Sequence, residues 1–450
     1  MTERLSRAMD HAIACATGAG ADDTEASYAG SELHFTRFAS SRFTQVGETR
    51  SDALRIRVLV NGRLGSQVCA SLDTDAVRAG AEAAVAAAKL SPRLDVDLSF
   101  NSGTADVGDS APVALPPNVT AAHMPKQLAE AFRAHADGGV LFAGSVKAHR
   151  NMVAVRTAGG LARAHDSCFV DAQVIGLADD ASGFAGWCGT PDGDIDLHSL
   201  ARTAADKARR SRSPLDLKPA GYDVILAPEA VSELLEWMAM ASFSATKVLD
   251  GTSLLCDRRG QRLCDERITI SDSPAAGEPT FDAEGSTRRT VTFIDAGTAG
   301  EPVSDLVVAL RMGDGATSTG HAVGVANNYE NDPAVAHLHV APGDQSEDEL
   351  IAAVDRGLYI TRFHYVNGLL DTRRATMTGM TRDGTFLIEN GEVGPGVRNL
   401  RFTQPMLEAL SRLGGLGSHV KDVPSWWTDA GVVSTPALLL RGFQFTGTSR

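Results

Sequence analysis

The sequence predicts an α+β protein in which helices back an N-terminal sheet and a C-terminal domain consists of antiparallel strands. Three observations support this prediction. Residues 52–68 contain two alternating strands joined by Asn61-Gly62, a dipeptide typical of tight hairpin turns. The alanine-rich stretch 71–90 has high helix propensity. Residues 358–366 alternate aromatic and β-branched side chains with others, which is the period of a half-buried strand.

Length and charge limit the classes of function. The chain has 450 residues, enough for two or three domains, and a formal net charge of −14. An acidic chain without a basic tract is not expected to bind nucleic acid. The N-terminus indicates an amphipathic helix rather than a signal peptide, and no run of about 18 apolar residues predicts a membrane span. We therefore expect a cytoplasmic protein without a membrane partner, whose six cysteines are buried thiols.

An N-terminal α+β domain is predicted over residues 1–99. After the first helix, residues 26–46 predict two strands and residues 52–68 predict two more. The helix at 71–90 then completes a sheet backed by helices. Residues 100–123 are rich in Gly, Ser, Ala and Pro and indicate a linker or surface loop.

A middle α+β segment is predicted over residues 124–218, and we expect it to extend the N-terminal unit. It begins with a helix at 124–136 and ends with a helix at 196–210, whose basic residues near the C-terminus complement the helix dipole. Three alternating stretches between the helices predict strands, at 141–146, 152–157 and 168–178.

A C-terminal antiparallel β domain is predicted over residues 219–450. It opens with a strand at 221–226 and a helix at 228–245, in which Pro228 suits the first helical position. The glycine-rich stretch 313–321 indicates a flexible loop, and loops of this kind often carry binding groups on a rigid scaffold. Two further elements are expected, a helix at 404–413 and a closing strand at 435–445.

The stretch 358–402 predicts an antiparallel meander. Its three dipeptides Asn367-Gly368, Asp383-Gly384 and Asn390-Gly391 can each supply the positive φ angles of a tight turn. The sequence of this stretch, above all TGMTRDGTFLIENGE, closely resembles the C-terminal signature of the TldD/PmbA family. The resemblance continues in order over nearly the whole chain, and it implies a C-terminal β domain that curls around the helix at 228–245.

The resemblance also implies that a metal site is missing. In TldD-type members, the helix that corresponds to 228–245 carries His-Glu-x-x-x-His, whose histidines bind the metal and whose glutamate is the general base. Residues 236–241 take that place here and read Glu-Trp-Met-Ala-Met-Ala, and the glycine-rich segment 414–420 lacks the cysteine that TldD-like members use. The chain thus resembles the TldE/PmbA type, with no catalytic residue, metal ligand or cofactor of its own.

Four residues are candidates for binding a substrate. Ser318 and His321 belong to the glycine-rich loop, and Arg362 and His364 belong to the strand 358–366. If this strand has a free edge, a peptide can bind to it by strand addition, in which main-chain hydrogen bonds give affinity with little sequence selectivity. Each candidate also has an ordinary interpretation, because His364 can be a hydrogen-bonded core histidine and the loop can be a plain connection.

A pair of histidines has the same two interpretations. His337 and His339 alternate on a predicted strand and therefore point to one face, as metal ligands sometimes do. Ser346, which follows with three acidic residues, suits the capped start of a helix better than a metal site. An ordinary strand explains the pair as well.

The expected function is that of the non-metal subunit of a TldD/TldE-type metallopeptidase complex that cleaves unfolded or small peptides. The resemblance implies that this chain shapes the cavity and provides a dimer surface, while a TldD-like partner bearing His-Glu-x-x-x-His supplies zinc. Two alternatives remain open. One is a metal-free homodimeric binding or scaffold protein, and the other is a tailoring hydrolase acting on a peptide-like small molecule.

Overall fold

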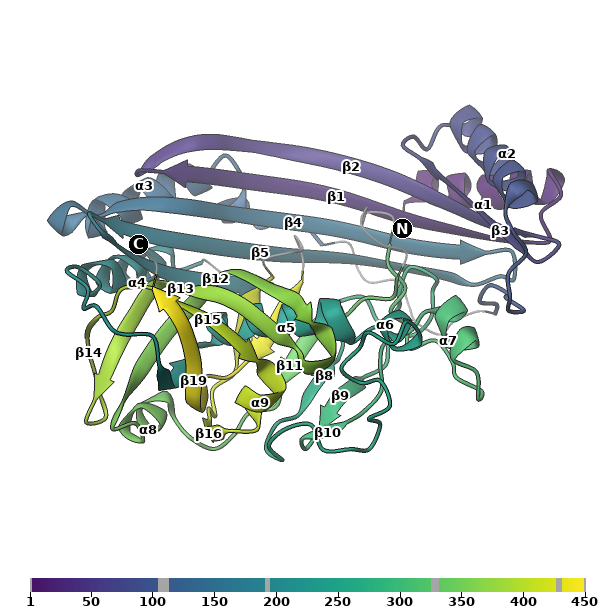
Figure 1. Cartoon of the computed structure of the whole chain (residues 1–450). Helices are drawn as coiled ribbons and strands as arrows, with labels where there is room; N and C mark the ends of the chain where they lie inside the picture. The colour runs from purple at the N-terminus through teal and green to yellow at the C-terminus, as the bar shows by residue number, and fades with distance from the viewer. Residues whose placement is uncertain (1, 104–112, 191–194, 325–331, 426–430, 449–450) are drawn as a thin grey trace.

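The computed structural model describes residues 2–103, 113–190, 195–324, 332–425 and 431–448. These residues form three β-sheets and the helices that cover them, which confirms the predicted α+β class (Figure 1). In the described part of the chain, no helix is both long and apolar enough to cross a membrane.

The first sheet has six antiparallel strands in the order β3-β2-β1-β4-β5-β6. β1 and β2 form one long hairpin, and β4 pairs with the other side of β1, so the middle part of the chain extends the N-terminal sheet. The strands are β1 (Asp23–Ala39), β2 (Arg42–Val60), β3 (Arg63–Cys69), β4 (Leu141–Thr157), β5 (Ala162–Ala178) and β6 (Ala181–Gly189).

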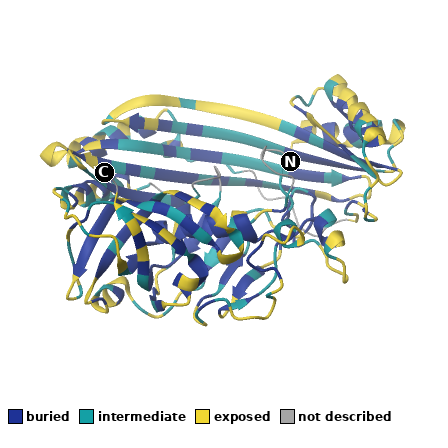
Figure 2. Ribbon diagram, in the orientation of Figure 1, coloured by how far each residue is buried: buried dark blue, intermediate teal, exposed yellow. Residues whose placement is uncertain are grey.

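Two predicted interruptions of these strands are absent. β2 continues through 47–51 and β4 continues through 147–151, where the sequence predicted breaks. β1 pairs with both stretches, since Leu33 lies opposite Thr49 on one side and His149 on the other. Pairing with a long neighbour therefore overrides the local preference of these polar stretches. Figure 2 shows β2 as the outermost long strand, exposed over its left half.

Helices cover one face of this sheet. Strand residues on that face pack against helices in two hydrophobic clusters, one near each end of the sheet. One cluster contains Leu54 and Ile56, and the other contains Val146 and Ala148. The opposite face points to the C-terminal half of the chain. The covering helices lie where the sequence predicted them, as α1 (Glu3–Gly18), α2 (Thr74–Leu90), α3 (Met124–His135) and α4 (Leu197–Arg210), with short η1 (Pro117–Val119) and η2 (Asp137–Gly139) between them.

The second sheet closes on itself. β12, β7, β19, β15 and β13 pair in turn, and β12 pairs again with β13, so the strands form a barrel. Most pairs are antiparallel, but β7 and β12 are parallel. The strands are β7 (Gly221–Leu226), β12 (Arg356–Asp371), β13 (Thr376–Glu389), β14 (Glu392–Gly396), β15 (Leu400–Pro405), β16 (Leu413–Leu416) and β19 (Leu438–Thr448).

The third sheet has six short strands in the order β10-β9-β8-β11-β18-β17, with β11 and β18 parallel. Its strands are β8 (Ile270–Asp272), β9 (Val291–Asp295), β10 (Thr298–Ala299), β11 (His337–Val340), β17 (Lys421–Pro424) and β18 (Val432–Thr435). The predicted closing strand at 435–445 is β19, which begins only at Leu438, while Thr435 ends the separate strand β18. Pro436 lies between them, and proline cannot donate to a ladder.

The helix α5 (Pro228–Ser242) lies between these two sheets. All of its residues except Ala239 and Met240 are buried, and it packs against β12, β17 and β18. The expected β domain around a central helix is therefore confirmed. The remaining helices are short: α6 (Ala245–Leu249), α7 (Leu306–Met312), α8 (Glu347–Ala352), α9 (Met406–Leu410) and η3 (Thr372–Arg374). The predicted helix at 404–413 is thus only α9, because strands occupy both of its ends.

One of the three predicted turns of the meander is correct. Asn390-Gly391 joins β13 to β14, with φ of 53° and 76°. The prediction is wrong for Asn367-Gly368, which lies inside β12, and for Asp383-Gly384, which lies inside β13. At Gly384 the absence of a side chain lets β13 pack closely against Thr361, because a Cβ atom would lie 2.6 Å from Thr361 Oγ1.

Candidate functional site

The central helix α5 presents carboxylates, and no imidazole or thiolate, to the interior. Glu229, Glu233 and Glu236 are all buried. Burial disfavours the charged form of Glu229, but the charges of Lys421, 2.7 Å away, and Lys207 outweigh it and lower its pKa. Burial raises the pKa of Glu233 to about 7. The first glutamate is thus held as an anion by lysines, and the second is poised near neutral pH.

These residues do not fit a zinc centre. Trp237 and Met238, at the place where the TldD-type motif would lie, are packed in the hydrophobic core. A catalytic zinc site needs three protein ligands, usually histidine, cysteine or carboxylate. In the described residues, no group of three or more such side chains could hold a metal ion.

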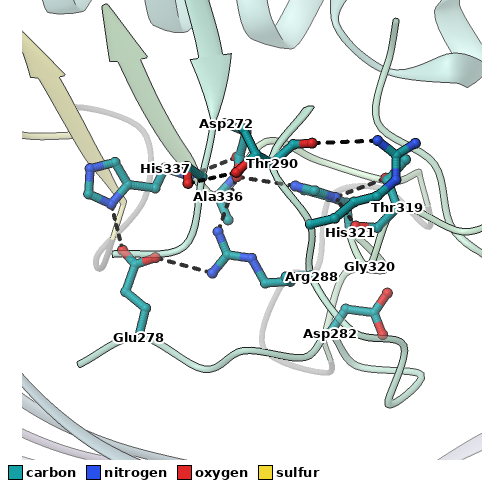
Figure 3. A network of polar contacts seen from close by, with 12 residues as sticks. Asp272, Glu278, Asp282, Arg288, Thr290, Thr319, Gly320, His321, Ala336 and His337 are labelled. Carbon is teal, nitrogen blue, oxygen red and sulfur yellow. Dashed lines mark hydrogen bonds and ion pairs between the residues drawn. The ribbon is translucent and has the colours of Figure 1, made fainter. Parts of the chain in front are cut away.

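A network of polar side chains surrounds Asp272 at the end of β8 (Figure 3). The Asp272 carboxylate is fully buried and lies 3.2 Å from Arg288 Nη2 and 3.2 Å from His321 Nε2. It also accepts backbone N–H groups of Ala336, at 2.6 Å, and His337, at 2.9 Å. Burial alone would raise the pKa of Asp272, but these partners lower it. Asp272 is therefore an anion that fixes the surrounding loops.

The network continues through His337 to a serine. His337 Nδ1 lies 2.8 Å from Glu278 Oε1, and its Nε2 lies 2.7 Å from Ser434 Oγ. The order Ser-His-Glu resembles a hydrolase triad, but Ser434 Oγ donates its proton to Asp422. His337 Nε2 must then donate to Ser434, and Glu278 raises the pKa of His337 despite burial. An imidazolium is no general base, so this group holds strands together.

The histidine pair is therefore divided. His337 belongs to the network through its contacts with Glu278 and Ser434. For His339, burial and the nearby charge of His337 lower the pKa. β11 is a strand, as the sequence predicted, and within the described residues no third ligand joins the two histidines. The ordinary interpretation of the pair accounts for the structure.

A cavity of about 270 Å³ lies between this network and the first sheet. Ala29 of β1 and Val153 of β4 line one side, and Phe281, Asp282 and His321 line the other. The walls are thus mainly apolar with a few polar groups, which is the usual character of a binding site. A space of this size suits one or two amino-acid side chains rather than a large ligand.

The predicted loop residues differ in their place. His321 is buried and lines the cavity, where its Nδ1 lies 2.9 Å from the carbonyl oxygen of Thr319. Ser318 is half-buried and does not line the cavity. Its Oγ donates to the carbonyl oxygen of Ser304, at 3.3 Å, and accepts the N–H of Gly320, at 3.1 Å. Ser318 therefore holds the loop that positions His321.

The predicted strand residues lie apart from the cavity. Arg362 is only 3% exposed, its Nε lies 2.8 Å from Asp383 Oδ2, and its guanidinium stacks over Phe184 at 4.6 Å. Burial first, and then the charges of Arg382 and Arg362, lower the pKa of the half-buried His364, which is therefore neutral at pH 7. Neither side chain lines the cavity.

The strand edge expected at 358–366 is partly closed. β13 pairs with one side of β12, and β7 pairs with residues 357–360 on the other side. The first half of the stretch is therefore internal to the barrel, and the expectation of a free edge there was wrong. The barrel closes through contacts between residues more than a hundred positions apart, which alternation alone does not reveal.

Four residues of the site were missed from the sequence. Asp272, Glu278, Asp282 and Arg288 come from a region without a repeated pattern, and single carboxylates in loops are common. Burial raises the pKa of Asp282 to about 7, although its carboxylate accepts three backbone N–H groups. The only available signal was the turn-like Asp282-Ala-Glu-Gly285.

Comparison with known proteins agrees with this architecture. Residues 219–447 match the model of the PmbA/TldA metallopeptidase C-terminal domain, and residues 25–88 match that of PmbA/TldA metallopeptidase domain 1. Both models describe domains of PmbA/TldA metallopeptidases, and the first alone covers more than half of the chain. The chain belongs to the PmbA/TldD family.

Sequence relatives cover from about half to most of the chain. A metalloprotease of Methanothermobacter thermautotrophicus is 25% identical over 404 residues, which is 84% of this chain and 84% of the relative. A metalloprotease of Methanocaldococcus jannaschii is 25% identical over 221 residues, 48% of this chain and 47% of the relative.

Two crystal structures share the fold. TldE from Thermococcus kodakarensis has a TM-score of 0.85 at 18% identity, over 98% of this chain and 100% of that one. A putative modulator of a DNA gyrase from Thermotoga maritima has a TM-score of 0.82 at 19% identity, over 98% of this chain and 100% of that one. The resemblance seen in the sequence is thus confirmed at the level of family and fold.

Proposed function

We propose that this chain is the subunit without metal in a TldD/TldE-type metallopeptidase and that it holds the peptide while a TldD-like partner supplies zinc. The observation that carries the proposal is α5. The chain belongs to a metallopeptidase family, yet residues 236–241 of this helix read Glu-Trp-Met-Ala-Met-Ala where a TldD-type member carries His-Glu-x-x-x-His. The partner's zinc would activate water for hydrolysis, and this chain would contribute binding surfaces.

The cavity beside His321 is the proposed place of a peptide side chain. Its mainly apolar walls suit an apolar side chain, and unfolded peptides expose such groups. The opposite wall belongs to β1 and β4, whose residues Ala29 and Val153 are too small to fill the space. A peptide bound here would lie between the first sheet and the C-terminal half of the chain.

The proposal is tested by recovering the complex from the native host. The chain is tagged, purified gently and analysed by mass spectrometry, and metal is measured on the same sample. We expect a homologue bearing His-Glu-x-x-x-His together with about one zinc per pair, since α5 of this chain carries neither histidine of that motif. If no sample contains such a homologue, the proposal that this chain is a peptidase subunit is wrong.

A second measurement tests the division of roles. Purified alone, the chain should bind a fluorescein-labelled unfolded peptide and leave it intact, with or without added zinc. Addition of the purified homologue should start cleavage, and a chelator should stop it. Cleavage by the isolated chain after exhaustive chelation would contradict the proposal and would direct attention to a tailoring hydrolase.

A further inference from the structure

The cavity beside His321 contains an acidic side chain without a counter-charge. Three side chains that commonly carry charge line this cavity: Asp282, Arg288 and His321. Arg288 contacts the carboxylates of Asp272 and Glu278, and His321 contacts that of Asp272. Within the described residues, Asp282 forms no ion pair, and its carboxylate accepts hydrogen bonds from backbone N–H groups. Of these three side chains, Asp282 is thus the one whose charge is left uncompensated.

Burial makes the missing counter-charge costly. Asp282 is only 7% exposed, and burial, together with the nearby charge of Glu284, raises its pKa to about 7. A buried carboxylate without a counter-charge is strongly disfavoured relative to one that is paired. A cation bound in the cavity would therefore stabilise the ionised form of Asp282.

The Asp282 carboxylate has room for one more hydrogen bond. Its Oδ1 accepts the N–H groups of Glu284 and Ser286, both at 2.9 Å, and its Oδ2 accepts that of Ala322 at 2.8 Å. Each carboxylate oxygen can accept about two hydrogen bonds, so Oδ2 keeps one acceptor position. Asp282 and Ala322 both line the cavity. A donor in the cavity can therefore bind Oδ2 while the loop keeps its three hydrogen bonds.

Two arginines of the first sheet do not supply the missing counter-charge. Arg163 of β5 lies over the ring of Phe281 at 5.8 Å, and Arg55 of β2 donates to the carbonyl oxygen of Val323 at 3.2 Å. The negative charge of Asp282 acts on both guanidinium groups through space. The pKa of Asp282 nevertheless stays raised to about 7, so these distant charges do not offset its burial.

The other walls of the cavity suit an alkyl chain. Ala29, Val153, Val155 and Phe281 line the space of about 270 Å³. A lysine side chain buries its four methylene groups along apolar surface and carries its ammonium to a polar group. Lysine thus meets the requirement for an apolar stem and adds the cation that Asp282 lacks. Norleucine, an uncharged side chain of similar shape, would fill the same walls and leave Asp282 unpaired.

We propose that the cavity binds a primary ammonium group on an alkyl chain, as in a lysine side chain, with the ammonium donating to Asp282 Oδ2 and the methylene groups against Ala29, Val153 and Phe281. This inference rests on the proposed function and deepens it, because it makes lysine-containing peptides the preferred substrates. The free N-terminus of a peptide presents the same chemical group, and the experiment separates the two sources.

The test compares fluorescein-labelled unfolded peptides that are acetylated at the N-terminus and differ at one central position. That position carries lysine, norleucine or glutamate, and fluorescence anisotropy at pH 8 gives the affinity for the purified full-length chain. We expect the lysine peptide to bind at least about tenfold more tightly than the norleucine peptide, and the glutamate peptide to bind most weakly. A norleucine peptide with a free N-terminus that matches the lysine peptide would support the ammonium site and identify the N-terminus as its source.

A variant and a change of pH attribute the preference to Asp282. Asp282→Asn should bind the lysine and norleucine peptides equally, and Asp295→Asn, at an exposed position of β9, should keep the preference for lysine. With wild type, the affinity for the lysine peptide should fall about tenfold from pH 8 to pH 6, because Asp282 takes up a proton below about pH 7 while lysine stays charged. The affinity for the norleucine peptide should change less.

The outcomes separate this inference from the proposed function. If wild type binds the lysine and norleucine peptides equally, the ammonium site is wrong, and the role in holding peptides stands. If wild type binds none of the peptides, both the proposed function and the ammonium site are wrong. A preference for lysine that survives in Asp282→Asn would place the ammonium elsewhere and overturn the inference. Should Asp282→Asn fail to fold, the comparison of lysine with norleucine on wild type still decides.

Discussion

At the scale of single residues, the position of Arg362 shows what a signature can and cannot predict. The sequence singles out this arginine, but its burial and its ion pair with Asp383 follow from the closed barrel and from Phe184 of the first sheet. An arginine that is 3% exposed beside an aspartate that is 2% exposed joins two parts of the molecule. The architecture therefore explains the place of Arg362 in this strand.

The first prediction concerns this ion pair. Arg362→Met should lower the free energy of unfolding by about 3–5 kcal/mol, because Asp383 would stay buried without its counter-charge. Urea denaturation measures the change. Arg382→Met is the matched control, since the Arg382 side chain is 47% exposed and its Nε lies 3.8 Å from the same carboxylate, and it should cost less than about 1 kcal/mol. Equal losses in the two variants would contradict the structural role.

Glycine gives a second prediction at this scale. Gly384 has φ of 122°, and a Cβ atom there would lie 2.6 Å from Thr361 Oγ1. Gly384→Ala should therefore cost about 1–3 kcal/mol of unfolding free energy, from both backbone strain and overpacking. Gly18→Ala, at a helical position with no atom within 4 Å of the added carbon, should be neutral or slightly stabilising. Thermal melts give the melting temperature of each variant. If Gly384→Ala melts at the wild-type temperature, β13 accommodates the added carbon without loss of stability.

At the scale of elements, a charged layer lies between the first sheet and the loop at 282–286. Arg57 Nη1 of β2 lies 2.7 Å from Glu284 Oε1 and 3.4 Å from Glu25 Oε1 of β1. Burial raises the pKa of Glu25 to about 7, and it raises the pKa of Asp305, which caps α7, to about 6. The two halves of the chain thus meet through carboxyl groups that titrate near neutral pH.

The third prediction is a pH dependence of stability. The folded pKa of Glu25 lies above its ordinary value of 4.5, so the folded state binds more protons between these two values. Its contribution to stability is complete below pH 4.5 and is lost as pH rises through about 7. Between pH 5 and pH 8 we expect this carboxyl to lower the unfolding free energy by about 1–3 kcal/mol. Urea denaturation at both pH values measures the loss.

The matched variant for that measurement is Glu25→Gln. Glutamine has nearly the same shape and does not titrate, so the variant should lose less stability than wild type over the same pH interval. A wild type and a variant with parallel pH profiles would mean that Glu25 titrates normally in the folded chain.

The elements also show how far sequence reasoning reaches. Local patterns located α1 to α5 and the turns at Asn61-Gly62 and Asn390-Gly391, because capping, helix propensity and turn chemistry act within a few residues. They missed the continuity of β2 and the interior position of Gly384, since both depend on pairing with distant strands. For the same reason the sequence could mark His321 but could not place it beside Asp272 and Arg288, which come from elsewhere in the chain.

At the scale of the whole molecule, the cavity proposed for a peptide lies between the first sheet and the C-terminal half of the chain. The family resemblance predicted an enclosed space for peptides. The residue pattern of the sequence did not show that β1 and β4 form one wall of the cavity. Ala29 of β1 lines this wall and is half-buried, so a larger side chain there would enter the cavity with little effect on the helix-covered face.

Filling the cavity gives the last prediction. Ala29→Phe should weaken binding of a fluorescein-labelled unfolded peptide by at least about tenfold, a loss of about 1.4 kcal/mol, because the new ring occupies the space proposed for an apolar side chain. Fluorescence anisotropy measures the affinity. Ala39→Phe is the matched control, since Ala39 is the exposed last residue of the same strand and should bind as wild type does. Both variants should melt close to wild type. If Ala29→Phe folds and binds the peptide unchanged, the peptide lies elsewhere, and the half-buried His364 on the barrel strand becomes the next position to test.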